Sequence, residues 1–316
     1  MRVGRHVSKI KLRTVEISVN KYSIKLYEQG FEEEQARIGF EVANSWLWPL
    51  AHDEQDLKRI HSQPNFDPES SLYCFDGNKM VGFISMSLPS PGSTDQSKAV
   101  LFVPRCLPGY EETSGLLIEK SLEVLRKRVV RKVEIQVSTM FKNSSALLES
   151  WGFAPSQDRG WGYKIYYSYK MLQSELGVDT TNVFEVDTSE EYDESAELAT
   201  NWYKMPKDWC KNLLDEWHAT GEVITHSFIK HRGKMVASCM AAPNNVRKDI
   251  TGMYFIYVKE VEYLPPLLSR VVHGCIQKRC KTLIVDLINE HRSYEDVYRS
   301  LGFAKSADWA IYEKEL

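Results

Sequence analysis

Residues 150–156 of the chain read Ser-Trp-Gly-Phe-Ala-Pro-Ser, and residues 300–306 read Ser-Leu-Gly-Phe-Ala-Lys-Ser. Five of these seven positions agree at an offset of 150 residues. Two weaker matches lie upstream in the same order, pairing 131–138 with 280–287 and 77–81 with 232–236, at offsets of 149 and 155. Three ordered matches at nearly one offset predict that the chain contains two copies of one domain.

The length and composition agree with this division. A chain of 316 residues that is 43% hydrophobic can build two ordinary globular cores. The repeat pattern breaks at residues 172–181, where Gly177 lies in a polar stretch. We therefore expect an N-terminal copy at residues 1–175 and a C-terminal copy at residues 176–316.

Both copies predict the same order of elements. The expected elements of the N-terminal copy are helical material at 33–60, a hairpin at 71–88, a strand at 99–103, a helix at 114–128, a strand at 132–138, a helix at 143–150 and a strand at 163–169. Those of the C-terminal copy are helices at 190–220, a hairpin at 225–242, a strand at 252–258, a helix at 267–278, a strand at 282–287, a helix at 294–300 and a strand at 309–313. This order predicts an α/β (α+β) fold with a strand–helix–strand crossover in each copy.

Composition and charge argue against several classes of protein. The net charge of −3 and the pI of about 6.3 do not suit a dedicated nucleic-acid binder. No apolar run is long enough for a membrane-spanning helix, and residues 1–13 lack the apolar core of a secretory signal. The six cysteines form no paired framework, and no histidine cluster has metal-ligand spacing. We expect a cytoplasmic protein with reduced thiols and no metal.

The end of each copy resembles the GNAT acyltransferase family. Residues 143–153, Asn-Ser-Ser-Ala-Leu-Leu-Glu-Ser-Trp-Gly-Phe, are similar to its Asn-x-x-Ala…Gly-Phe segment, and residues 293–303 are similar to its Leu-Tyr-x-x-Leu-Gly-Phe variant. The two-copy layout is similar to the mycothiol-synthase-like tandem members. The resemblance implies two tandem domains, each a twisted, mixed and mostly antiparallel sheet with flanking helices.

The resemblance also implies acetyl-CoA as co-substrate. In the family, a glycine-rich loop at a helix start holds the diphosphate with its N–H groups. The family's Arg/Gln-x-x-Gly-x-Gly/Ala pattern is absent from this chain, and Gly109, Thr113, Ser114 and Gly115 of the N-terminal copy are the residues that could form such a loop. Arg105 could add positive charge there, whereas Glu111 and Glu112 would repel a phosphate.

Further cofactor contacts follow from the same resemblance. We expect them from Asn143 and from the middle strand of each copy, at Phe102 and Val103 in one and at Val258 in the other. The C-terminal copy has a poorer loop, because Pro265 and Pro266 each remove a backbone donor.

Acid and base roles point instead to the C-terminal copy. In the family, a tyrosine four residues before the glycine of Gly-Phe often protonates the leaving thiolate. That position is Leu148 in the N-terminal copy and Tyr298 in the C-terminal copy. We predict Tyr298 as the acid and Glu260 as the base. Which copy is catalytic stays open at this stage.

The predicted function is N-acyl transfer from acetyl-CoA to the primary amine of a small molecule or an amino-acid-like acceptor. A backbone N–H of the middle strand would hold the oxyanion. Trp46, Trp48 and Trp217 belong to the early helices, which wall the acceptor pocket in the family or else pack the copies together.

Two alternatives remain. One is a Fem-like transferase that uses aminoacyl-tRNA, which the basic stretch 126–132 would suit. The other is a non-catalytic acyl-CoA-binding or sensor module. The acceptor is expected to be a small molecule, with no membrane or nucleic-acid partner, and the sequence sets no oligomeric state.

Overall fold

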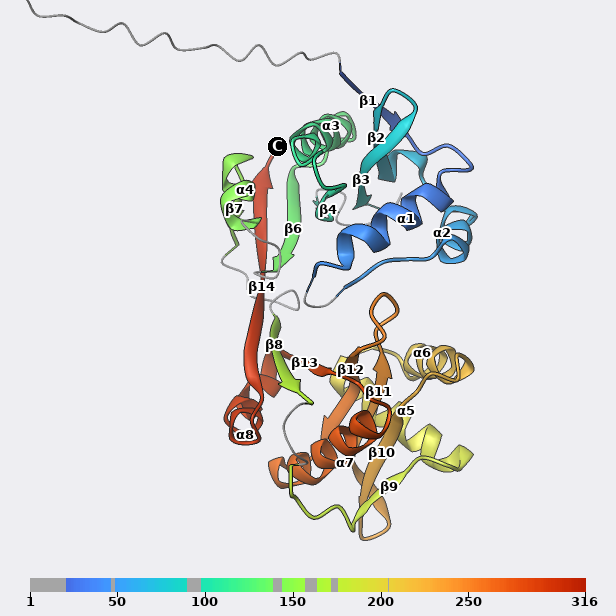
Figure 1. Cartoon of the computed structure of the whole chain (residues 1–316), viewed down its shortest axis with the longest axis vertical. Helices are drawn as coiled ribbons and strands as arrows, with labels where there is room; N and C mark the ends of the chain where they lie inside the picture. Colours follow the sequence, from blue (N-terminus) through green and yellow to red (C-terminus); the bar gives the residue numbers. More distant parts are fainter. Residues whose placement is uncertain are drawn as a thin grey trace, which may run out of the picture.

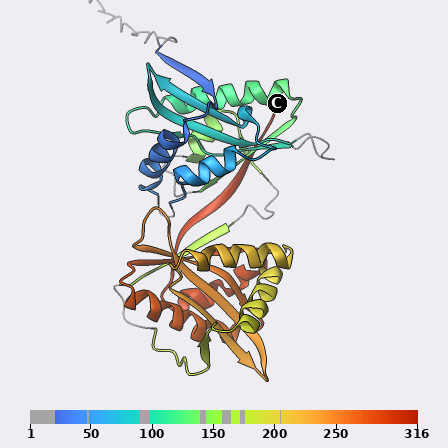
Figure 2. The same cartoon turned by 90° about the vertical axis from the view of Figure 1, so that its right-hand side faces the viewer.

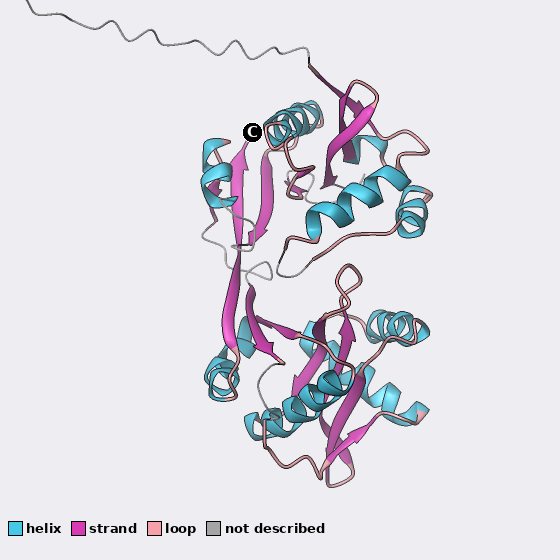
Figure 3. Cartoon of the chain, in the orientation of Figure 1, coloured by secondary structure: helices cyan, strands magenta, loops and turns pink. Residues whose placement is uncertain are grey.

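The molecule has two lobes stacked along its long axis (Figure 1). The computed structural model describes residues 21–46, 49–89, 98–138, 144–156, 164–171, 176–203 and 205–316. A long strand near the C-terminus runs from one lobe into the other, which is also visible after a quarter turn (Figure 2). Strands pass through the middle of each lobe and helices cover them (Figure 3).

The N-terminal copy follows the predicted order. Its elements are β1 (Tyr22–Leu26), α1 (Glu32–Ala43), α2 (Glu54–His61), β2 (Ser71–Asp76), β3 (Lys79–Ser87), β4 (Lys98–Leu101), β5 (Arg105–Cys106), α3 (Thr113–Lys127), β6 (Lys132–Ser138), α4 (Ser144–Ser150), β7 (Ala154–Pro155) and β8 (Lys164–Lys170). The helix α3 buries Leu117, Ile118, Leu122 and Leu125 on one face, as the spacing of apolar residues predicts.

The C-terminal copy repeats this order. Its elements are β9 (Val183–Glu185), α5 (Ser189–Tyr203), α6 (Lys207–Ala219), β10 (Thr225–His231), β11 (Lys234–Pro243), β12 (Ile250–Val258), α7 (Leu264–Gln277), β13 (Thr282–Ile288), α8 (Glu295–Ser300) and β14 (Ala304–Glu315). Pro265 and Pro266 lie in the first turn of α7, where a missing N–H removes no helical hydrogen bond. Among the described residues, no helix is both long and apolar enough to cross a bilayer.

The sheet is mixed and mostly antiparallel, as predicted. Its strands follow the order β1-β2-β3-β4-β6-β14-β8-β13-β12-β11-β10-β9. The parallel pairs are β4 with β6 and β12 with β13. The helices α3 and α7 connect these pairs, so each copy contains the predicted crossover.

The two copies exchange strands. The second half of β14 pairs with β6 of the N-terminal copy, from Trp309 opposite Ser138 to Glu315 opposite Lys132. In return, β8 pairs along its whole length with β13 of the C-terminal copy. The cores share this exchange, because Tyr312 of β14 packs in the N-terminal core and Tyr167 of β8 packs in the C-terminal core.

The strand at 163–169 was expected to close its own copy, and that interpretation is wrong. It completes the sheet of the other copy, because β14 occupies the edge of β6. The last strand is also longer than the predicted 309–313, since it must reach both sheets. The boundary near residue 175 stays a prediction, and the hydrogen-bonded sheet continues across it.

The exchange predicts that the copies cannot fold separately. Residues 1–175 expressed alone would leave the edge of β6 unpaired and expose β8, and both edges promote aggregation. We expect each fragment alone to be insoluble and co-expressed fragments to form a soluble heterodimer, read by size-exclusion chromatography. A cooperative, monomeric 1–175 fragment would contradict this.

A series of buried hydrogen-bonding side chains links α5 and α6 of the C-terminal copy to β10 and β11. Ser195 Oγ of α5 lies 2.7 Å from His226 Nε2 of β10 and 2.8 Å from Ser238 Oγ of β11. His218 Nε2 of α6 lies 2.9 Å from His226 Nδ1. Burial, followed by the neighbouring His218, lowers the pKa of His226 to about 3.

This network predicts acid sensitivity. The unfolded chain has an ordinary histidine pKa near 6.5, so only the unfolded state binds a proton as the pH falls below 6.5. We expect His226 to cost about 2 kcal/mol of stability between pH 6.5 and pH 5. The pH slope of the melting temperature should shrink in His226→Gln, and an unchanged slope would refute the assignment.

Candidate active site

The middle strand of each copy is interrupted by an extra residue. In the N-terminal copy, Leu101 pairs with Met86 and Arg105 pairs with Phe83, so residues 102–104 stand opposite residues 84–85. In the C-terminal copy, residues 255–256 stand opposite Cys239, and Phe255 has a φ of 52°. An extra residue of this kind re-aims the backbone and ends regular pairing.

The interruption coincides with the point where the parallel strands separate. Pairing of β4 with β6 ends at Leu101 opposite Ile135, and pairing of β12 with β13 ends at Gly252 opposite Ile284. In the N-terminal copy, the hydrogen bonds of the described residues provide no acceptor for the Val103 N–H. Pro104 has no N–H. The Val103 N–H is therefore a free backbone donor at the start of the gap.

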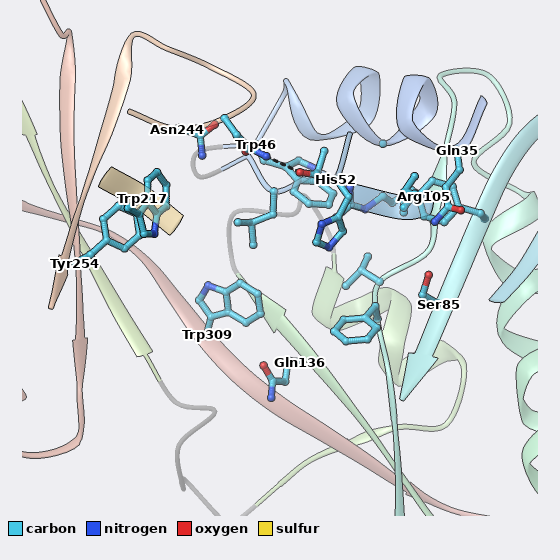
Figure 4. A pocket seen from close by; sticks show the side chains of 18 residues that line it. Gln35, Trp46, His52, Ser85, Arg105, Gln136, Trp217, Asn244, Tyr254 and Trp309 are labelled. Carbon is cyan, nitrogen blue, oxygen red and sulfur yellow. Dashed lines mark hydrogen bonds between the residues drawn. The ribbon is translucent and has the colours of Figure 1, made fainter. Parts of the chain in front are cut away.

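A cavity of about 660 Å³ opens at this gap and extends between the copies (Figure 4). Its wall contains residues of the N-terminal helices and the connection between them, of β3, β5 and β6, of the gap after β4, and of the C-terminal copy. They are Gln35, Gly39, Trp46, Leu50, Ala51, His52, Leu57, Phe83, Ser85, Phe102, Val103, Arg105, Gln136, Trp217, Asn244, Asn245, Tyr254 and Trp309. The wall is mainly aromatic and apolar, with a few polar groups, as is common for small-molecule sites.

The C-terminal copy closes this cavity with three features. Asn244 Nδ2 donates to the Pro49 carbonyl at 2.7 Å, and Asn245 Nδ2 donates to the Ala51 carbonyl at 2.6 Å. Trp217 packs on Tyr254 with ring centroids 4.9 Å apart. Trp309 enters on the exchanged strand β14 (Figure 4). The predicted role of Trp46 and Trp217 as pocket walls agrees with this arrangement, while Trp48 lies outside the described residues.

Arg105 is held between aromatic rings at the edge of the cavity. Its guanidinium carbon lies 5.0 Å from the Trp46 ring centroid and 5.8 Å from that of Phe83. Burial lowers the pKa of the guanidinium to about 10, so it stays charged at neutral pH.

His52 points into the same cavity from the connection between α1 and α2 (Figure 4). The His52 side chain is 62% exposed, and its partial desolvation in the cavity is the main cause that lowers its pKa below 6.5; Asp56 opposes this shift and Arg105 acts in the same direction. The imidazole is therefore neutral at pH 7 and able to accept a proton.

The architecture matches solved proteins over nearly the whole chain. A tandem GNAT protein from the clavulanic acid biosynthesis pathway aligns with a TM-score of 0.63 at 12% identity, covering 93% of this chain and 98% of that one. A GCN5-related N-acetyltransferase from Sphaerobacter thermophilus aligns with a TM-score of 0.63 at 10% identity, covering 94% and 96%.

The chain has the tandem GNAT fold. The resemblance predicted from the ends of the two copies is thereby confirmed. In sequence, the chain is 32% identical to mycothiol acetyltransferase of Brachybacterium faecium over 103 residues. That match spans 31% of the length of the relative and 32% of this chain. No family model matches the sequence.

The predicted cofactor residues of the N-terminal GNAT copy lie in two places. Phe102 and Val103 line the cavity between the copies. Gly115 lines a second cavity of about 740 Å³ on the outer face of α3, where Trp151, Lys21 and Lys314 also lie. Asn143 lies outside the described residues. Their roles stay predictions.

The phosphate loop of this GNAT copy is occupied by its own side chains. The Gly109 N–H donates to the Glu111 carboxylate at 3.0 and 3.1 Å. Thr113 Oγ1 donates to the Tyr110 carbonyl at 2.7 Å, and Ser114 Oγ lies 3.2 Å from Cys106 Sγ. A diphosphate would have to displace the Glu111 carboxylate to reach the Gly109 N–H.

The predicted residues of the C-terminal GNAT copy lie away from the cavity wall. Tyr298 is 1% exposed and packs against Tyr167 and Phe303, and burial raises its pKa well above 10. Val258 is buried in the same core, and Glu260 is exposed just after β12. Their roles stay predictions.

Sequence reasoning missed His52 and assigned Arg105 to the phosphate loop. Arg105 lines the cavity instead, at the start of β5. Its orientation depends on the extra residue between Leu101 and Arg105, which no sequence pattern reveals. No local pattern marks His52, which lies in a connection. Within the described residues, no three His, Cys, Asp or Glu side chains are grouped to hold a metal.

Proposed function

We propose that the protein is an N-acyltransferase that moves the acyl group of acetyl-CoA to the primary amine of a small molecule bound between the two copies. One observation carries this proposal. The Val103 N–H, which has no acceptor among the described residues, lies at the strand gap on the wall of a cavity of about 660 Å³. This supports the N-terminal copy as the catalytic one.

The chemistry is direct attack. The neutral amine adds to the thioester carbonyl, and the C–S bond breaks as the tetrahedral intermediate collapses to the amide. The Val103 N–H donates to the oxyanion of that intermediate. The neutral His52 accepts the proton that the amine loses. A thiol pKa near 8.5 allows the sulfur to leave as a thiolate, so Leu148 at the usual tyrosine position does not prevent the reaction.

Acetyl-CoA itself fits the second cavity, along the outer face of α3. Lys21, Arg126 and Lys314 line this cavity and supply positive charge for the phosphates, while Glu112 and Glu119 on the same wall oppose it. The six cysteines are free thiols, which suits a cytoplasmic location for an acyl-CoA enzyme.

The occupied phosphate loop favours a second candidate, a transferase whose donor lacks a diphosphate, such as aminoacyl-tRNA. This candidate is supported by the hydrogen bond that the Gly109 N–H donates to the Glu111 carboxylate. Binding of tRNA that weakens steeply with salt, without binding of acetyl-CoA, would select this candidate.

The first test removes the backbone donor. Val103→Pro deletes the free N–H without deleting a hydrogen bond of the fold, and Val103→Ala is the matched control. We expect Val103→Pro to lower the rate of CoA release about 100-fold or more, while calorimetry shows unchanged acetyl-CoA binding. Equal rates in both variants would remove Val103 from the mechanism, and absence of any acetyl-CoA binding would remove the proposal.

The second test concerns His52. We expect His52→Gln to lower kcat/KM about 100-fold at pH 7, with His273→Gln on α7 as the control. The neutral imidazole is lost as the pH falls through its lowered pKa, so the advantage of wild type over His52→Gln should shrink as the pH falls below 6.5. A constant ratio across pH 5 to 8 would exclude His52 as the base.

A further inference from the structure

The charge on the wall of the cavity between the copies is positive. Among the described residues that line it there is no Asp, Glu or Lys, and Arg105 is the one of them that is cationic at all neutral pH values. A site for polyamines or other polycations would need carboxylates on its wall. This wall offers one cation surrounded by aromatic rings.

Two glycines make room for Arg105. A Cβ at Gly39 of α1 would lie 3.3 Å from Arg105 Nη1, which is closer than most such contacts. A Cβ at Gly82 of β3 would lie 2.9 Å from the Arg105 carbonyl oxygen, so a side chain there would prevent β5 from pairing with β3. The lack of a side chain at Gly39 and Gly82 thus allows α1 and β3 to lie close to Arg105.

The guanidinium also lacks an anionic partner. Within the described residues, no carboxylate lies within ion-pair distance of Arg105, and its side chain donates no hydrogen bond. Some other arginines of the chain are paired. Arg270 donates to Glu185 at 2.8 Å, and Arg247 lies 3.2 Å from Asp249. A guanidinium held by rings on its faces keeps its edge N–H groups available. These groups match a carboxylate in bidentate geometry.

We propose that the acceptor is an amino-carboxylate, an amino acid or short peptide, whose carboxylate pairs with Arg105 while its amine attacks the thioester. This inference rests on the proposed function, since it names the acceptor of that site. Val103 and Arg105 both line the same cavity of about 660 Å³, so one small molecule bound there can contact both. Trp217, Tyr254 and Trp309 favour an apolar or aromatic side chain on that acceptor.

The test compares acceptors that differ only in the carboxylate. Phenylalanine is paired with phenethylamine, tryptophan with tryptamine and leucine with isoamylamine, and CoA release from acetyl-CoA is measured for each. We expect kcat/KM for at least one amino acid to exceed that of its decarboxylated partner about 10- to 100-fold. Equal or better use of every decarboxylated amine overturns the inference and leaves the proposed transferase intact.

Variants then assign the preference to Arg105. Arg105→Gln should abolish the preference, Arg105→Lys should keep part of it, and Arg270→Gln, which lies outside both cavities, should keep all of it. A preference that survives in Arg105→Gln overturns the assignment. Circular dichroism verifies that the variants fold, and the acceptor pairs on the wild-type protein decide the substrate class even if Arg105→Gln does not fold.

A binding readout separates this inference from the proposed function. 3-Phenylpropionate carries the ring and the carboxylate but no amine, and its binding should quench the fluorescence of the tryptophans around Arg105. Quenching that is lost in Arg105→Gln, without any acyl transfer, would support the carboxylate site and refute the transferase. Neither quenching nor transfer with any acceptor of the panel would overturn both.

Discussion

The separation of β4 from β6 after Leu101 is the constraint on which the site depends. Parallel strands normally satisfy each other's backbone groups, so a pair that diverges must leave some of them without partners. In the N-terminal copy the described hydrogen bonds leave the Val103 N–H without an acceptor at this gap, and Pro104 has no N–H. A donor that is already fixed in place gains more from a developing negative charge than one that must first be oriented.

The two copies share this architecture, but they use it differently. In the C-terminal copy the interrupted strand presents Phe255, which packs against α5 and α6 in a closed apolar cluster. Tyr298 packs in a different cluster of the same copy, in the core that also contains Tyr167. The C-terminal copy instead supplies Trp217, Tyr254 and the β11–β12 turn to the cavity of its neighbour. The C-terminal copy thus forms part of the wall of the cavity that opens at the strand gap of the N-terminal copy.

The sequence predicts the repeated parts of this fold well because local rules govern them. Gly152 and Gly302 end their helices at φ values of 78° and 88°, which favour glycine, and Phe153 and Phe303 are each 3% exposed. The strand exchange is different, because the aromatic strand β8 has the same local pattern whichever neighbour it pairs with. Its partner is chosen by contacts more than 100 residues away in sequence.

The expected cofactor contacts Phe102 and Val103 come from the family resemblance, and both line the cavity. Their role stays a prediction. The direction of Arg105 depends on an extra residue in that strand, which changes the side chains that face the cavity beyond it. His52 depends on the path of the connection between α1 and α2, which the hydrogen bonds from Asn244 and Asn245 help to define.

The shared strand β14 also has a consequence for synthesis on the ribosome. Residues 309–315 complete the sheet that begins with β1, yet they are synthesised long after β6, with most of the C-terminal copy made in between. The N-terminal copy therefore keeps an open sheet edge at β6 until β14 has left the ribosome. Folding of the N-terminal copy is thus delayed behind synthesis of the C-terminal copy, and its unfinished sheet is the species that chaperones would encounter.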